Sequence, residues 1–252
     1  YIDQSEIRIE PAKRQIFGWV NNQRFVNDSK SFRNYFVVQF DKPFEDYGVW
    51  ENQKDEMFPK KQDGAGKGYG AYIKFKKGSK VQAKAASSYI SAEQALVTLN
   101  KELGADKTLE VTKARGWKIW NELLNRIIVE GCTDEQLRTF YSCLFRANLF
   151  SRKFYERKVN GEPYYYSPYN GKIYDGYMYT DNGFWDTFRS QFPLTNILHP
   201  TMQGRYMNAL LAAQQQCGWL PSWSAPGETG GMLGNHSISL LTDAWSKGIR
   251  SF

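Results

Sequence analysis

The chain has 252 residues, a length that suits one large domain or two smaller ones. Hydrophobic residues make up 41% and charged residues 23%, so the chain can bury a core. No apolar run approaches the ~20 residues that span a membrane. The net charge of +7 permits binding to polyanions, but much of the excess lies between Lys54 and Lys84 in a Gly-rich, strand-forming region. Lysines that protect a sheet edge account for this pattern, because no nucleic-acid-binding motif accompanies them.

The first part of the chain, up to about residue 90, is predicted to form β-structure. Alternating or β-branched runs occur at residues 8–10, 15–20, 34–40, 72–76 and 81–85. The glycine-rich stretch 64–70 fits neither the dinucleotide-binding pattern nor the Walker pattern, because Tyr69 stands where a third glycine is needed and no Gly-Lys-Ser/Thr occurs. We therefore expect a flexible hairpin loop there.

The pattern becomes helical from Ser91 onward. Ser91 with Gln94, and Thr133 with Gln136, have the spacing of capping boxes that begin helices. The aromatic stripes of the helices that follow have the period of one buried face, so we expect them to lie in a core. Further apolar repeats predict helices at about residues 117–127, 185–198, 207–217 and 237–247.

The stretch from Tyr179 to Arg189 is the most informative one for function. It places an indole, a carboxylate and a guanidinium within five positions, as Trp185, Asp186 and Arg189. Sugar sites use this set, because an aromatic ring stacks on the C–H face of a pyranose while charged groups bind its hydroxyls. Two alternatives stay open: Trp185 lies in the core at a helix start, or Asp186 and Arg189 form a surface ion pair.

Several other polar residues are candidates for a site. Glu228 and Thr229 lie in a Gly- and Pro-containing loop, where a charged residue is either functional or simply solvated. His236 begins a helix and is either a site residue or a structural one. Asp181 and Asp243 complete the set of candidate carboxylates. The three cysteines form no CxxC pair and only two histidines occur, so no zinc site is predicted and any metal ligands stay unknown.

Several blocks of the sequence, taken together, resemble one family. They are residues 88–95, Phe140-Tyr141-Ser142-Cys143-Leu144-Phe145-Arg146, Trp185-Asp186-Thr187-Phe188-Arg189-Ser190-Gln191-Phe192-Pro193-Leu194, Gly218-Trp219-Leu220-Pro221-x-Trp223, Glu228-Thr229, Met232-x-Gly234-x-His236-Ser237 and Asp243-Ala244-x-x-Lys247-Gly248-Ile249-Arg250. In order and approximate spacing they are similar to the family-92 glycoside hydrolases, the calcium-dependent exo-acting α-mannosidases.

The resemblance implies an α+β multidomain protein. Residues 1–90 would be part of an N-terminal β-sandwich, residues 91–131 linker helices, and residues 132–252 the first half of an (α/α)6 toroid. It also implies inverting hydrolysis of terminal α-mannosides in mannose-containing glycans, a bound calcium ion, and location in the periplasm or outside the cell. Trp185, Asp186, Arg189, Glu228, Thr229 and His236 would bind the substrate.

The resemblance also indicates what this sequence lacks. In the family the general acid and the general base lie in the later half of the toroid, so we expect them beyond Phe252. The chain is therefore expected to be an internal fragment, inactive alone, whose partner is the rest of the same polypeptide and whose calcium ligands lie outside it. Two other functions stay open: a toroidal polysaccharide lyase, suggested by Asn235-His236 and the positive charge, and a non-catalytic carbohydrate-binding module.

Overall fold

The computed structural model describes residues 4–21, 33–51 and 56–252. The chain divides into two compact units, and each is described by itself. The first contains Tyr1–Asp106 and Glu156–Glu162, and the second contains Lys107–Tyr155 and Pro163–Phe252. No helix in the described ranges is long and apolar enough to span a membrane.

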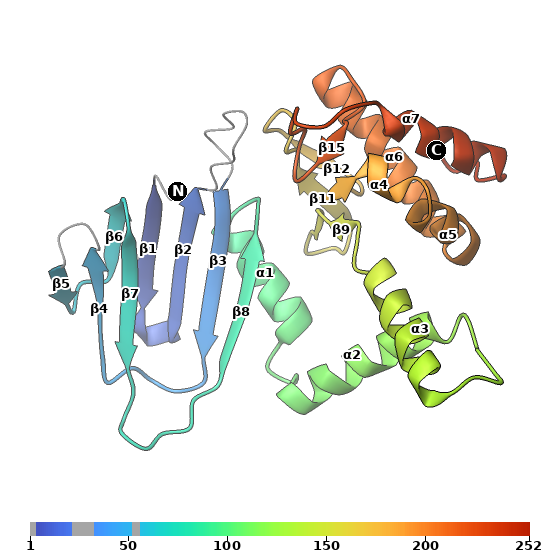
Figure 1. Cartoon of the computed structure of the whole chain (residues 1–252). Coiled ribbons are helices and arrows are strands. Elements are labelled where there is room, and N and C mark those ends of the chain that lie inside the picture. The colour runs from blue at the N-terminus through green and yellow to red at the C-terminus, as the bar shows by residue number, and fades with distance from the viewer. Residues whose placement is uncertain (1–3, 22–32, 52–55) are drawn as a thin grey trace. The chain divides into compact units, whose positions relative to one another are not determined.

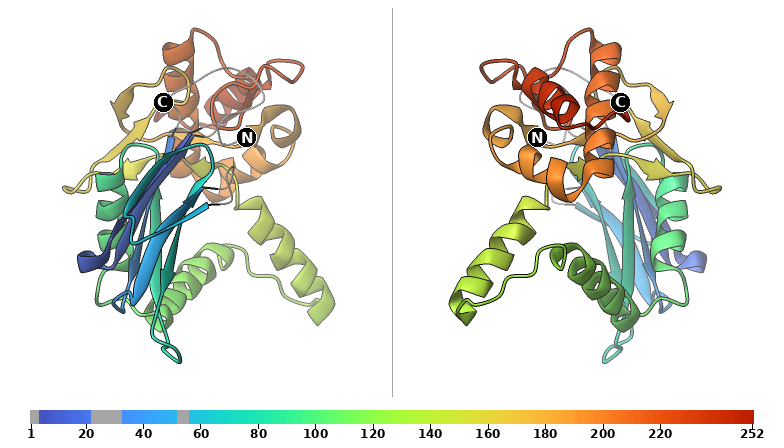
Figure 2. Two further views of the ribbon diagram at one scale, coloured as in Figure 1. Left: turned by 90° about the vertical axis from the view of Figure 1, so that its left-hand side faces the viewer. Right: turned by 90° about the vertical axis from the view of Figure 1, so that its right-hand side faces the viewer.

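The first unit contains a β-sandwich (Figures 1 and 2). One sheet has the strand order β6-β1-β2-β3-β8 and the other has the order β5-β4-β7. The strands are β1 (Ser5–Glu10), β2 (Gln15–Asn21), β3 (Arg33–Phe40), β4 (Asp46–Glu51), β5 (Glu56–Pro59), β6 (Asp63–Gly66), β7 (Tyr69–Lys74) and β8 (Ala83–Ser88). A short 3-10 helix, Pro11–Lys13, joins β1 to β2.

Apolar side chains fill the space between the two sheets. Ile9 of β1 and Val49 of β4 are fully buried there, and Ile7 and Ile16 lie beside them. Helix α1 (Ala92–Leu103) covers the opposite face of the five-stranded sheet, where Val37 packs against Ala95 and Leu99. Both faces of that sheet therefore carry buried apolar residues.

The predicted strands are confirmed with small shifts, but the prediction for residues 64–70 is wrong. These residues belong to β6 and β7, joined by a turn at 67–68, and the two strands lie in different sheets. The backbone of β6 pairs with β1, with Ile7 opposite Gly64. The Tyr69 ring lies so close to Gly64 that a Cβ atom there would overlap it. The glycines therefore allow close packing and do not mark a flexible loop.

The second unit is mainly helical and includes several short strands. Its helices are α2 (Leu109–Leu124), α3 (Asp134–Ala147), α4 (Phe184–Thr187), α5 (Gln191–Leu198), α6 (Pro200–Cys217) and α7 (His236–Ser246). Its strands are β9 (Arg152–Lys153), β11 (Pro163–Tyr166), β12 (Ile173–Asp175), β13 (Tyr179–Thr180), β14 (Asn182–Gly183) and β15 (Trp223–Ser224). Strand β10 (Glu156–Arg157) belongs to the first unit. A β-type region followed by helices confirms the coarse fold prediction. The exact domain boundaries stay a prediction.

The aromatic stripe of α2 is not in a core. Trp117 is 64% exposed and no residue of α2 is buried, whereas we expected this face to be covered. Trp120 contacts Phe145 of α3, with ring centroids 4.4 Å apart. At the start of α3 the predicted capping box is confirmed: Thr133 and Gln136 exchange side-chain-to-backbone hydrogen bonds.

The helix predicted over residues 185–198 is divided in two. Helix α4 ends at Thr187 and α5 begins at Gln191. Pro193 has no backbone N–H and its ring would clash with the preceding turn, so it is tolerated only near a helix start. A new start at Gln191 places Pro193 in the first turn of α5. Helix α6 similarly begins at Pro200, and Gly218, at φ +91°, ends it as predicted.

Candidate functional site

The stretch from Tyr179 to Gly183 links two pairs of strands through one residue. Strand β13 pairs with β9, so that Thr180 lies opposite Arg152. Strand β14 pairs with β15, so that Gly183 lies opposite Trp223. Between them Asp181 has a left-handed φ of 64°. Its carboxylate oxygens lie 2.6 and 3.3 Å from the Arg152 guanidinium, which ties this candidate carboxylate to β9.

Phe184 and Trp185 point in different directions at the start of α4. Phe184 is 2% exposed and lies in the core formed by α4 to α7, with its ring centroid 6.5 Å from that of Phe192. Trp185 is 41% exposed. The alternative that placed Trp185 in the core is therefore wrong, because Phe184 occupies that position. The indole is available to solvent and to a ligand.

Asp186 and Arg189 are both exposed, and they do not form the ion pair that was considered. The Asp186 carboxylate has no hydrogen-bond or ion-pair partner in the described parts of the chain. The Arg189 guanidinium carbon instead lies 4.7 Å from the centroid of the Phe188 ring. A cation over an aromatic face is a weak but favourable contact at such exposed sites.

His236, at the first position of α7, contacts the same phenylalanine. The His236 and Phe188 rings are stacked, with centroids 4.6 Å apart and planes inclined by 10°. His236, at the start of α7, and Arg189, just after α4, therefore both contact the ring of Phe188. The prediction named both residues as site residues but not Phe188. Phe188 lies within the Trp185–Arg189 segment, so its position between them in the sequence was the available signal.

Glu228 organises its own loop. Its carboxylate accepts hydrogen bonds from the Ser222 N–H at 2.7 Å, the Ser222 hydroxyl at 2.8 Å and the Gly230 N–H at 2.7 Å. The Thr229 N–H donates to the Trp223 carbonyl at 3.1 Å. Glu228 is thus not simply solvated, and it holds the loop from Ser222 to Gly230 in a closed conformation.

The β14–β15 pair brings that loop next to the Trp185 segment. The Trp223 ring lies over Gly183, where an added Cβ would be 2.6 Å from the indole. Any side chain at position 183 would therefore displace Trp223. Trp223 was part of a quoted sequence block but was not chosen as a site residue, since its partner lies forty positions away in the sequence.

All six predicted residues thus lie on three neighbouring segments of one unit: the α4 region, the Ser222–Gly230 loop and the start of α7. No hydrogen bond or ion pair of the described residues joins any two of the six. What they share is support from the same short strands and the same core. Figure 1 shows α4, β15 and α7 in this unit.

A small pocket in the same unit contains none of the six. Burial raises the pKa of the Tyr169, Tyr179 and Tyr206 hydroxyls above the ordinary value. The Asn182 amide donates to the Ser151 hydroxyl. The lining residues are Ser151, Tyr169, Tyr179, Asn182, Phe184, Phe192, Tyr206, Ala209 and Leu210.

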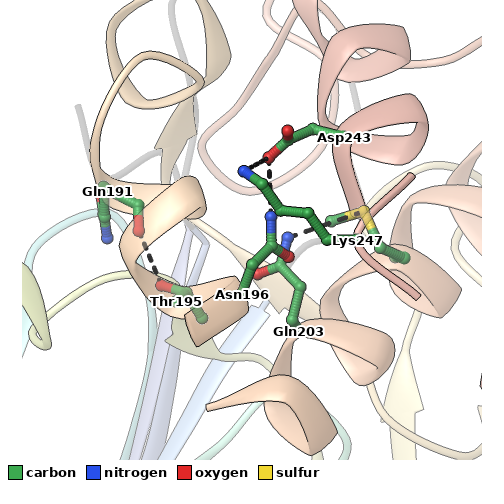
Figure 3. A network of polar contacts seen from close by, with 7 residues as sticks. Gln191, Thr195, Asn196, Gln203, Asp243 and Lys247 are labelled. Carbon is green, nitrogen blue, oxygen red and sulfur yellow. Dashed lines mark hydrogen bonds and ion pairs between the residues drawn. The ribbon is translucent and has the colours of Figure 1, made fainter. Parts of the chain in front are cut away.

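Asp243 has a structural role. It accepts a hydrogen bond from the Asn196 amide at 2.7 Å and forms an ion pair with Lys247, also at 2.7 Å (Figure 3). Asn196 belongs to α5 and Asp243 to α7, so the contact joins two helices. Nearby Gln203 of α6 is fully buried (Figure 3). Asp243 is therefore paired within the fold.

The described residues contain no cluster of His, Cys, Asp and Glu side chains that could hold a metal ion. No group of three or more His, Cys, Asp or Glu side chains within them is arranged to hold an ion. Calcium needs six to eight oxygen ligands. The described carboxylates alone do not bring that many oxygen atoms together in one place.

Comparisons with known proteins define the class to which this arrangement belongs. The model of the glycosyl hydrolase family 92 catalytic domain matches residues 94–252. The model of the glycosyl hydrolase family 92 N-terminal domain matches residues 1–88. The chain therefore belongs to glycoside hydrolase family 92. No curated protein sequence is similar enough to count as a match.

Solved structures of the same family are similar over the whole chain. The family GH92 inverting mannosidase from Bacteroides thetaiotaomicron VPI-5482 is 44% identical, with a TM-score of 0.93. The match covers 100% of this chain and 34% of that one. A family GH92 α-mannosidase from Bacteroides thetaiotaomicron, in complex with mannoimidazole, is 22% identical with a TM-score of 0.87, covering 100% of this chain and 33% of that one. This chain thus spans about a third of the length of these relatives.

Proposed function

We propose that this chain is the part of an inverting, exo-acting α-mannosidase that binds the terminal sugar. The carrying observation is the exposed Trp185 indole beside the unpartnered Asp186 carboxylate, at a position where Phe184 fills the core. Similarity to an inverting mannosidase supports this class of reaction. In the proposal a mannose ring stacks on Trp185 and its hydroxyls donate to Asp186.

Arg189 and His236 are proposed to complete the sugar site by donating hydrogen bonds. Both contact Phe188, which limits the directions in which they point. Glu228 and Thr229 support the adjoining loop, and in the proposal that loop forms a wall of the site. A residue held by backbone bonds in this way positions a ligand without rearranging.

The acid and base are proposed to lie in the part of the enzyme that this chain does not span. Inverting hydrolysis needs two carboxyl groups roughly 6.5–9.5 Å apart, one to protonate the leaving oxygen and one to activate water. Three of the four candidate carboxylates are engaged within the chain: Asp181 by Arg152, Asp243 by Asn196 and Lys247, and Glu228 by its loop. Asp186 alone is available, which supports sugar binding without proton transfer here.

Further elements of the proposal follow from family membership. The helices of the second unit would be the first part of an (α/α)6 toroid completed by the rest of the polypeptide. Calcium would be bound by ligands outside this chain, and α-mannoside glycans would be the substrates. The enzyme would act in the periplasm or outside the cell. No observation favours nucleic acid as a partner of this site.

The test is the reaction of the whole enzyme that contains this chain. We expect it to release mannose from α-mannosides with inversion of the anomeric configuration. NMR of the anomeric proton of the released mannose measures this. Trp185→Ala and Asp186→Asn should each lower kcat/KM about 10- to 100-fold, since each tenfold corresponds to about 1.4 kcal/mol. Trp219→Ala is a matched control, because Trp219 is also exposed, at 60%.

Three results would each contradict a part of the proposal. An unsaturated uronate product that absorbs in the ultraviolet would establish a polysaccharide lyase. Sugar binding without turnover by the whole protein would establish a carbohydrate-binding module. Full turnover by the 252-residue chain alone would show that the acid and base lie within it.

A further inference from the structure

The outer face of the sheet β5-β4-β7 carries two aromatic rings that lie against the strands. Val49 is fully buried between the sheets, so its neighbours Gly48 and Trp50 face outward. On β7, Ala71 and Ile73 belong to the core, so Gly70 and Tyr72 face outward as well. Figure 1 shows these three strands.

Each ring covers a glycine of the adjacent strand. Trp50 pairs with Gly70, and a Cβ atom at Gly70 would overlap the indole. Tyr72 pairs with Gly48, where an added Cβ would be 2.7 Å from the phenol ring. Because neither glycine has a side chain, each ring packs directly against the backbone of the adjacent strand. We call Trp50, Tyr72 and the two glycines beneath them the aromatic platform.

The platform is accessible at Trp50. Trp50 is 37% exposed, and Met57, opposite it on β5, is 61% exposed. Trp50 and Tyr72 are diagonal neighbours on one face, which places their backbones about 7–8 Å apart. Flat apolar rings on a rigid sheet suit the C–H face of a pyranose, because ordering them costs little conformational entropy on binding.

Positive charge lies at one end of the platform. The Asp46 carboxylate is 2.7 Å from the Lys60 ammonium and 3.6 Å from the Lys74 ammonium, so two cations share one anion. Lys60 and Lys74 are 61% and 67% exposed. These two lysines outnumber the one carboxylate that they share. The charge complementary to this surface is negative.

We propose that the outer face of β5-β4-β7 binds an anionic glycan. A pyranose ring stacks on Trp50 and Tyr72. A phosphate, sulfate or carboxylate group of the glycan binds at Lys60 and Lys74. This site lies in the first unit, whereas Trp185 lies in the second, so the inference stands independently of the proposed catalytic function.

The test measures binding of the 252-residue chain to a mannan that carries phosphodiester groups. The same mannan after removal of its phosphate and a single-stranded oligonucleotide are the comparison ligands. We expect the phosphorylated mannan to bind best and its affinity to fall with added salt. Trp50→Ala should weaken binding about tenfold. Trp117→Ala, which removes another exposed tryptophan, should change it less than about twofold.

Two further variants separate a lost contact from a lost fold. Gly70→Ala keeps both rings but displaces the indole, so it should weaken binding as Trp50→Ala does. Lys60→Gln with Lys74→Gln should abolish the preference for phosphorylated over dephosphorylated mannan while leaving the thermal unfolding midpoint unchanged.

Each contrary outcome overturns the inference. Equal affinity of wild type and Trp50→Ala would show that the aromatic platform does not bind the glycan. Equal affinity for the phosphorylated and the dephosphorylated mannan would show that the anionic group does not contribute to binding. Tighter binding of the oligonucleotide through the same residues would make the site a nucleic-acid site.

Discussion

The loop from Ser222 to Gly230 provides a quantitative test of the site's rigidity. In the Glu228→Ala variant the carboxylate that accepts three hydrogen bonds is lost. Hydrogen bonds to charged groups contribute about 1.5–3 kcal/mol each. Gly230 is exposed, so water can replace its bond at little cost. The two bonds from Ser222 then account for a loss of about 3 kcal/mol in the free energy of loop opening.

The reporter is the Thr229 amide proton, which bonds to the Trp223 carbonyl and not to Glu228. The substitution leaves that bond intact, so faster exchange of this proton measures opening of the loop. A loss of about 3 kcal/mol corresponds to about a hundredfold faster hydrogen exchange. Ser222→Ala removes only the hydroxyl bond, worth about 1.5 kcal/mol, and should accelerate exchange by about tenfold.

The Met207 amide, in the middle of α6, is the internal control and should exchange at the same rate in all variants. An acceleration of less than about threefold at Thr229 in Glu228→Ala would refute the reasoning. It would mean that the contacts between Trp223 and Thr229 hold the loop and that the Glu228 carboxylate contributes little to the free energy of loop opening.

Four other substitutions test three separate parts of the structure. Burial raises the pKa of the Glu156 carboxyl above its ordinary 4.5, so the charged form is disfavoured in the folded chain, and stability rises as the pH falls through the raised value. Glu156→Gln should therefore raise the melting temperature at pH 7 and have no such effect below pH 4.5. Thr133→Ala removes the capping box of α3 and should cost about 1 kcal/mol in urea unfolding. Asp243→Ala leaves the Asn196 amide without its acceptor and should cost about 1–2 kcal/mol, whereas Lys247→Ala, at the exposed end of the same contact, should cost less than about 1 kcal/mol.

Local signals in the sequence predicted local structure well. The capping box at Thr133, the stop at Gly218 and the strand around Val37 are determined by a few adjacent residues, and each is confirmed. The division of the helix at residues 188–190 was missed, although Pro193 carried the signal. The apolar pattern continues across the break, and pattern alone does not register a missing N–H.

Long-range arrangement was not accessible in the same way. The pairing of Gly183 with Trp223 joins two strands of two residues each, too short to give any periodic signal. The aromatic period of α2 predicted a buried face, but Trp117 is exposed. Period indicates that one face is apolar, while the neighbour that covers a face must be supplied by other parts of a structure.

The opposed directions of Phe184 and Trp185 have a consequence for how such a protein can change. Because the buried ring and the exposed one are adjacent but separate, positions 185, 186 and 189 can vary without altering the packing around Phe184. Ligand preference can thus diverge while the fold is inherited intact. A one-residue deletion before Phe184 would instead shift Trp185 into the buried position and force an indole into a space shaped for a phenyl group. Substitution is tolerated in this segment, and insertion or deletion is not.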